Sequence, residues 1–238
     1  MKGYFTKGEL ALWLGSCAAI AGAFFLFATG DYLTFLASLI GVTSLIYSAK
    51  GHPVGQALMI LFSLIYGVIS YSCAYYGEML TYLGMTMPMA VVALISWLRH
   101  PYEGKKTQVK INRLRGSEWI LASVLTAVVT AIFYFVLKAF DTKQLFLSTI
   151  SVATSFAAVY LTFRRSAFFA LAYAANDIVL ILLWLLASME DTGYVSVIVC
   201  FAAFLVNDIY GFFNWQSMQR SQTEKTKNGC ICHETMIE

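Results

Sequence analysis

Residues 166–188, SAFFALAYAANDIVLILLWLLAS, form an apolar run with one amide and one carboxylate at its centre. At ~1.5 Å of rise per residue, a helix of this length can cross the ~30 Å hydrocarbon core of a bilayer. Asn176 and Asp177 lie about eleven residues from either end, so a spanning helix places them near the midplane. An ionised carboxylate there costs at least ~2.5–3.5 kcal/mol against lipid. We therefore expect this face of the helix to point into protein or a wet cavity.

Seven further apolar runs resemble this one, at about 9–29, 31–49, 53–76, 79–98, 118–138, 145–163 and 193–215. The chain is 59% hydrophobic and only 12% charged, against ~25% charge in soluble domains. Strands are excluded as spanning units, because the runs are too long and do not alternate in polarity. The sequence therefore predicts an all-α polytopic membrane protein with eight transmembrane helices.

The charges between the runs predict how the chain crosses the membrane. Even-numbered loops and both termini are basic, most strongly the loop at 99–117, whereas odd-numbered loops are acidic or mixed. By the positive-inside rule, both termini lie in the cytoplasm. The first run follows Lys2 and Lys7 as a signal peptide would, but its length and the lack of a clear cleavage site favour a retained helix. Nucleic-acid binding is not expected, because the basic residues lie in short loops between apolar runs.

The order of the helices predicts an internal repeat. The segments are an extra N-terminal helix (1–30), a first three-helix bundle (31–98), the basic cytoplasmic loop (99–117), a linking helix (118–144), a second three-helix bundle (145–217) and a cytoplasmic tail (218–238). A single linking helix gives both bundles the same orientation. Trp97 and Trp215 end the two bundles and are expected to be anchors at the cytoplasmic interface. Parallel three-helix repeats are typical of transporters whose site lies between the repeats.

A second polar pair, Asn207-Asp208, lies nearer the cytoplasmic end of the last run. Asn207, Tyr210, Gly211 and Asn214 recur at i, i+3, i+4 and i+7, which places them on one stripe of a helix. Lining a pore, this stripe would supply donors, acceptors and a ring for stacking. The alternative is that these groups join helices through hydrogen bonds.

Aromatic residues accompany the first polar pair. Tyr173 and Trp184 share a helical face with Asn176 and Asp177, and the third run contributes Gln56 and Tyr66. A ring close to a buried carboxylate can hold a flat organic cation, because the ring stacks on it while the acid balances its charge. The alternative for each ring is packing alone.

Catalytic and cofactor motifs are missing from the sequence. It contains no Gly-rich phosphate loop with Lys and no Ser-His-Asp set. His52 and His100 are scattered, and Cys230, Cys232 and His233 supply only three donors for a metal. We therefore expect neither an enzyme nor a bound cofactor.

Four motifs carry a resemblance to a known family. Residues 55–67 (GQALMILFSLIYG), 76–90 (YGEMLTYLGMTMPMA), 176–179 (NDIV) and 207–215 (NDIYGFFNW) resemble the PnuC family of nicotinamide riboside transporters. The similarity runs from about residue 31 to 218. It implies a SWEET-like fold of 3+1+3 helices after the extra N-terminal helix. It also implies facilitated diffusion of nicotinamide riboside across the bacterial inner membrane, with phosphorylation by a cytosolic kinase trapping the product.

The resemblance also implies binding residues. Members of the family bind substrate through Asn, Gln and Trp residues midway along the core helices, and Asn176, Trp184 and Asn207 are the matching positions. This chain departs from the family in the stretch 168–173, where Phe and Tyr stand in place of a Trp-x-x-Trp. Related families carry thiamine, which is also a cation, so another cationic vitamin is an alternative substrate.

The residues and the resemblance together predict a uniporter for nicotinamide riboside. Asp177 and Asp208 would balance the cation, Asn176 and Asn207 would bind ribose hydroxyls or the amide, and Trp184 would stack. A proton-coupled carrier in which Asp177 titrates is an alternative. From a different class, a membrane receptor or assembly subunit would use the same polar groups only to join helices. A homo-oligomer is possible in each case.

Overall fold

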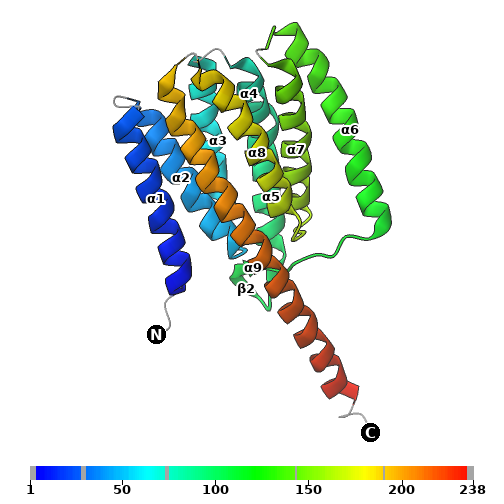
Figure 1. The fold of residues 1–238 in the computed structure, drawn as a ribbon. Helices are drawn as coiled ribbons and strands as arrows, with labels where there is room; N and C mark the ends of the chain where they lie inside the picture. Colours follow the sequence, from blue (N-terminus) through cyan, green and yellow to red (C-terminus); the bar gives the residue numbers. More distant parts are fainter. Residues whose placement is uncertain (1–3, 28–30, 73–74, 143, 190, 235–238) are drawn as a thin grey trace.

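The computed structural model describes residues 4–27, 31–72, 75–142, 144–189 and 191–234, with side chains described as far as 226 (Figure 1). Among these residues, eight helical segments are long and apolar enough to span a membrane. They are α1 (Lys7–Phe27), α2 (Tyr32–Ala49), α3 (Val54–Ser72), the fourth segment Tyr76–Arg99, α6 (Gly116–Ala139), α7 (Leu145–Phe163), α8 (Phe169–Ser188) and α9 (Val195–Glu234). The prediction of eight helices is confirmed.

The fourth segment is irregular. It consists of α4 (Tyr76–Leu80), a π-helical turn η1 (Thr81–Thr86) and α5 (Met87–Arg99). Pro88 lies in the first turn of α5, where a missing N–H is tolerated. The irregular backbone therefore precedes the proline. A short 3-10 turn, η2 (Thr192–Tyr194), leads into α9.

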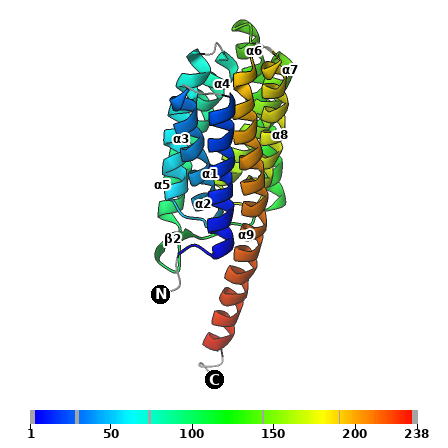
Figure 2. The same ribbon diagram turned by 60° about the vertical axis from the view of Figure 1, so that its left-hand side comes forward.

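The helices run side by side, with both termini at one end of the bundle (Figure 1). α1 packs against α2 and α9 (Figure 2). α6 packs against α7 on the opposite side of the bundle (Figure 1). The central contacts are those of α2 with α3 and α9, and of α8 with α7 and α9. Gly55 lets α3 approach α2 closely, because a Cβ there would lie only 2.6 Å from the Ser48 backbone nitrogen.

The last helix and the basic loop differ from the prediction. α9 does not end near residue 215 but continues to Glu234, and it projects beyond the bundle (Figure 1). The basic loop forms an antiparallel hairpin of β1 (Pro101–Tyr102) and β2 (Lys105–Val109). Gln222 joins α9 to this loop. Its side chain donates to the Val109 carbonyl at 3.1 Å and accepts from the Ile111 N–H at 2.9 Å. The side chains of Cys230, Cys232 and His233 lie outside the described part of the chain.

The prediction that Trp97 and Trp215 are interface anchors is wrong. The two side chains are 1% and 0% exposed, and their rings lie 5.4 Å apart in the interior. Trp97 Nε1 donates to the Thr162 carbonyl at the end of α7, at 2.9 Å. Trp215 Nε1 donates to the Ser48 carbonyl at the end of α2, at 2.8 Å. Each indole therefore binds the end of a helix in the other three-helix bundle.

Neighbouring side chains repeat this exchange. Ser96 Oγ donates to the Phe163 carbonyl at 3.1 Å, and Asn214 Nδ2 donates to the Ala49 carbonyl at 2.8 Å. The last helix of each bundle thus bonds two consecutive carbonyls at the end of the first helix of the other. This reciprocal pattern is the one expected if the two bundles are copies of one three-helix unit, as predicted from the order of the helices.

Candidate solute-binding site

A small cavity lies between the two bundles, among α2, α3, α7, α8, α9 and the π-helical turn. Its volume is about 20 Å³, room for roughly one water molecule. Apolar and aromatic side chains form most of the wall. The polar residues that line it are Tyr82, Thr86, Ser155, Tyr173, Asn176, Asp177 and Asp208. We call this space the inner cavity.

Asn176 is held by the neighbouring helix. Its Oδ1 accepts hydrogen bonds from the hydroxyls of Ser151 (3.3 Å), Thr154 (2.8 Å) and Ser155 (2.9 Å), all on α7. These three bonds occupy the oxygen and fix the plane of the amide. The NH₂ group therefore remains to bind a solute. The α8 backbone places this amide on the cavity wall, as expected for a residue near the middle of the span.

Asp177 and Asp208 meet inside the protein. They come from α8 and α9, are 3% and 4% exposed, and both line the inner cavity, where their carboxyl groups interact electrostatically. Two buried carboxyl groups this near each other repel when both are ionised, and a cation bound beside them would relieve that repulsion. Asp177 Oδ2 has no hydrogen-bond partner among the described residues, which leaves an acceptor buried beside the cavity.

The predicted aromatic pair is divided between two places. Tyr173 lines the inner cavity. Trp184 lies further along α8, where it lines a separate pocket together with Tyr66, towards the end opposite the termini. Gln56 lines neither space, because its Nε2 donates to Ser48 Oγ on α2 at 3.3 Å.

The stripe on α9 packs against other helices. Asn207 Nδ2 donates to Ser16 Oγ of α1 at 2.9 Å, and the Tyr210 hydroxyl donates to Glu9 at 2.9 Å. Asn214 bonds the end of α2, as described above. In this conformation these contacts fit the alternative interpretation, in which the stripe joins helices through hydrogen bonds. Any substrate contact of Asn207, Tyr210 or Asn214 stays a prediction.

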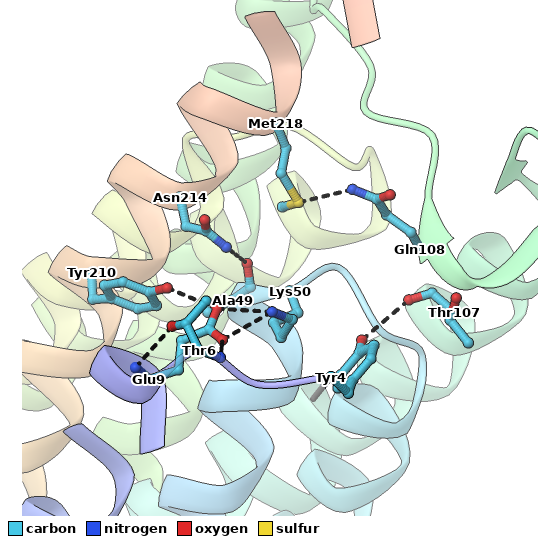
Figure 3. Close-up of polar contacts among 10 residues, drawn as sticks. All are labelled: Tyr4, Thr6, Glu9, Ala49, Lys50, Thr107, Gln108, Tyr210, Asn214 and Met218. Atoms are coloured by element: carbon cyan, nitrogen blue, oxygen red, sulfur yellow. Dashed lines mark hydrogen bonds and ion pairs between the residues drawn. The ribbon is translucent and has the colours of Figure 1, made fainter. Parts of the chain in front are cut away.

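Glu9 forms the centre of a polar cluster at the end that carries the termini (Figure 3). Its carboxylate is 3% exposed and accepts from Lys50 Nζ at 2.9 Å through both oxygens. The Lys50 ammonium also lies 5.1 Å from the Tyr4 ring centre and 5.6 Å from that of Phe5. The pKa of Tyr4 is raised to about 12, mainly by burial and to a smaller extent by the nearby Tyr47 and Glu9. Its hydroxyl therefore remains a hydrogen-bond donor.

Some residues of the site were not predicted from the sequence. Tyr82 was not singled out, and it reaches the cavity beside Thr86 from the π-helical turn, a feature often found at functional sites. Ser151 and Ser155 are spaced i, i+4, which was a readable sign of a polar face on α7. Glu78 lies in α4 and is 2% exposed, with Oε2 unpartnered within the described structure. Groups of three or more His, Cys, Asp or Glu side chains able to hold a metal do not occur among the described residues.

Eight apolar helices with an amide and a carboxyl pair buried between two three-helix bundles define a membrane carrier of small solutes. The family model of the nicotinamide mononucleotide transporter matches residues 31–217. The chain belongs to this family, as the resemblance of its motifs indicated. α1 lies outside the matched residues.

Individual relatives agree with this assignment. The nicotinamide riboside transporter PnuC of Neisseria mucosa is 25% identical over 214 residues, covering 87% of this chain and 81% of that protein. Its namesake from Haemophilus influenzae is 22% identical over 191 residues, covering 79% and 80%. The crystal structure of the vitamin B3 transporter PnuC matches with a TM-score of 0.81 and 22% identity over 92% of this chain and 95% of that one. That likeness confirms the fold.

Proposed function

We propose that this chain carries nicotinamide riboside across the bacterial inner membrane by facilitated diffusion, with both termini in the cytoplasm. The observation that supports it most is the buried Asp177–Asp208 pair beside the fixed Asn176 amide. The substrate combines a flat pyridinium cation with a carboxamide and ribose hydroxyls. Negative charge on the carboxyl pair would balance the cation, and in a site shielded from water this attraction is much stronger than in solution.

The polar wall suits the remainder of the substrate. The NH₂ group of Asn176 can donate to a carboxamide or ribose oxygen, and Thr86 and Ser155 carry hydroxyls on the same wall. Tyr173 and Tyr82 are the polar-edged rings of the inner cavity and are suited to stack on a pyridinium. Stacking by Trp184 in this cavity requires a different conformation.

The structure is closed on both sides of the inner cavity. Towards the end opposite the termini, Tyr66 packs on Tyr82 at 4.5 Å between ring centres and on Phe62 at 5.4 Å. Towards the termini, the buried pair of Trp97 and Trp215 fills the interior. A cavity of about 20 Å³ cannot hold a nucleoside, so binding requires the two bundles to move apart. Rocking of one repeat against the other opens each side in turn.

Facilitated diffusion only equilibrates the substrate, so net uptake needs a step that removes it inside the cell. Phosphorylation by a cytosolic riboside kinase does this, because the charged product no longer fits a site that balances a cation. The basic residues at the end that carries the termini agree with a cytoplasmic location of that end.

Uptake of labelled nicotinamide riboside into proteoliposomes tests this proposal. Saturable uptake that stops at equilibrium, and continues when a riboside kinase and ATP are enclosed, is expected. Competition by excess unlabelled thiamine measures how far the site accepts another cationic vitamin. Absence of saturable uptake of both riboside and thiamine would overturn the carrier proposal.

Proton coupling is the second candidate, because the two buried carboxyl groups of Asp177 and Asp208 line the same cavity, and acidic residues within membrane helices often form proton relays. In a coupled carrier, an imposed pH gradient drives riboside above its equilibrium level, and collapsing the gradient abolishes that accumulation. In a uniporter, the final level is the same with and without the gradient.

A further inference from the structure

A second polar pocket lies outside the inner cavity, at the end opposite the termini. Its volume is about 270 Å³, slightly below the ~300–1,000 Å³ of typical small-molecule sites. It is enclosed by α2, α3, α8, η2 and the first turn of α9. Asp31 and Asp191 contribute exposed carboxylates, and Tyr66, Trp184 and Tyr194 contribute rings. We call this space the outer pocket.

Three rings line the outer pocket, those of Tyr66, Trp184 and Tyr194, and Tyr75 lies beside them outside the lining. The Trp184 and Tyr194 ring centres lie 5.2 Å apart with their planes at 47°, and Tyr75 lies 4.9 Å from Trp184. Tyr66 follows at 6.5 Å from Trp184, nearly perpendicular to it. Trp184 and Tyr66 are almost fully buried in the wall of the pocket, whereas Tyr194 is partly exposed. Aromatic rings attract flat organic cations through their π-faces.

Three buried polar atoms along this pocket lack partners. Thr34 Oγ1, the Tyr66 hydroxyl and Trp184 Nε1 form no hydrogen bond within the described structure, although the residues are only 6%, 3% and 1% exposed. The Tyr66 hydroxyl and the Trp184 N–H lie near each other but do not reach hydrogen-bond geometry. Buried polar groups are normally paired. These atoms are therefore available to a ligand with donors and acceptors.

The two acids each have a structural role that leaves one oxygen for a ligand. Asp31 Oδ1 accepts the Thr34 N–H at 3.1 Å at the start of α2, and Asp191 Oδ1 accepts the Gly193 N–H at 2.8 Å at the start of η2. The second oxygen of each group is not used in these caps. Lysine and arginine are missing from the described lining of the pocket, so its field attracts cations.

A pair of tyrosines separates the outer pocket from the inner cavity. Tyr66 lines the outer pocket and Tyr82 lines the inner cavity, and their ring centres are 4.5 Å apart. The buried Glu78 interacts electrostatically with both rings. A cation leaving the outer pocket would therefore pass a third carboxyl group before reaching Asp177 and Asp208.

We propose that the outer pocket is a capture site for flat cationic solutes, which binds the substrate before the tyrosine pair opens towards the inner cavity. This inference deepens the proposed function and rests on it for the identity of the solute. It assigns Asp31 and Asp191 to attraction of the cation, and Trp184 and Tyr194 to stacking.

The test uses substitutions that keep the caps. Asp31→Asn and Asp191→Asn retain a side-chain oxygen that caps well, so the fold should persist while two charges are lost. Asp141→Asn is the matched control, because Asp141 is exposed at the same end beside α6 and has a φ of 50° that Asn tolerates. Thermal melting of each purified full-length variant verifies its folding.

Binding is measured by quenching of indole fluorescence with 1-methylnicotinamide, a pyridinium cation without ribose, and with neutral nicotinamide. We expect saturable quenching by the cation that Trp184→Phe removes. The double Asp variant should raise the Kd for the cation at least about threefold at low salt, with the difference disappearing at high salt. The Kd for nicotinamide should not change in the double variant. Asp141→Asn should bind the cation with the wild-type Kd.

Uptake by the same variants separates this inference from the proposed function. With wild-type uptake present, the double variant should raise KM for the riboside and leave the maximal rate unchanged. An unchanged Kd and KM in the double variant, or an equal rise in Asp141→Asn, would overturn the capture site while leaving transport intact. Cation binding that depends on Asp31 and Asp191 without any riboside uptake would support the outer pocket and refute the proposed function.

Discussion

Replacement of Trp215 by Phe tests whether the two bundles hold each other through reciprocal bonds. The Ser48 carbonyl loses the indole N–H at 2.8 Å but keeps the Gly51 N–H at 2.9 Å. The carbonyl is thus not left unpaired, and the lost bond costs ~1 kcal/mol rather than the full desolvation penalty. Trp215 is fully buried, and the space left by the smaller ring adds ~1–2 kcal/mol. We expect a total loss of ~2–3 kcal/mol in the free energy of unfolding.

Unfolding in mixed detergent micelles, followed by circular dichroism, measures this loss. Trp97→Phe should cost a similar amount, because Thr162 keeps the Arg165 N–H at 3.0 Å after losing the indole. The double variant should deviate from additivity by ~0.5 kcal/mol or more, since the two rings are in contact. Trp119→Phe is the control, because Trp119 is 38% exposed on α6 and should cost under ~0.5 kcal/mol. Equal losses for Trp215→Phe and Trp119→Phe would show that the reciprocal indole bonds between the bundles do not contribute to stability.

Three further predictions concern stability and are read by thermal melting in detergent. Glu9→Gln should destabilise the protein by ~2–3 kcal/mol, less than for a fully buried pair because Lys50 remains 18% exposed and can reach water. Gly55→Ala should cost ~1–3 kcal/mol, because the new Cβ would overlap the α2 backbone. Burial lowers the pKa of His52; the unfolded chain therefore takes up a proton near pH ~6.5 that the folded chain does not, and stability should fall below that pH.

Each of these predictions has its own control. Replacing Lys50 by Met should recover much of the loss in Glu9→Gln, and a double variant as unstable as the single one would contradict the ion pair. Gly15→Ala should not destabilise, since a Cβ there has no neighbour within 4 Å among the described residues; a loss equal to that of Gly55→Ala would count against close packing. In His52→Asn the decline below pH ~6.5 should be smaller, and an unchanged decline would exclude His52 as its source.

The membrane helices were predictable because bilayer thickness limits the length of an apolar run. The end of α9 was not, because beyond residue 215 no lipid boundary acts and the helix is stabilised by the hairpin through Gln222. The burial of Trp97 and Trp215 was also not predictable from the sequence. A Trp near a helix end suits either the lipid interface or a helix-capping site, and only the packing of the other bundle decides between them.

The candidate site was predictable in part, for a related reason. The depth of Asn176 and Asp177 identified a buried polar face, and the structure places both on the inner cavity. Periodicity alone could not show which partner each stripe faces. The stripe of Asn207 and Tyr210 meets Ser16 and Glu9 of α1, a helix nearly two hundred residues away in the sequence. Trp184 shares a helical face with Tyr173 but lies too far along α8 to enter the same space.

We propose that Asn176 binds the transported solute whereas Asn207 joins helices. Uptake kinetics of nicotinamide riboside, with thermal melting, should be compared for Asn176→Ala and Asn207→Ala in proteoliposomes. We expect a KM raised about tenfold or more for Asn176→Ala, equivalent to ~1.4 kcal/mol of lost binding. For Asn207→Ala we expect a lower melting temperature with KM unchanged. Reduced stability in both variants with KM unaffected in both would instead indicate that these amides only hold the helices together.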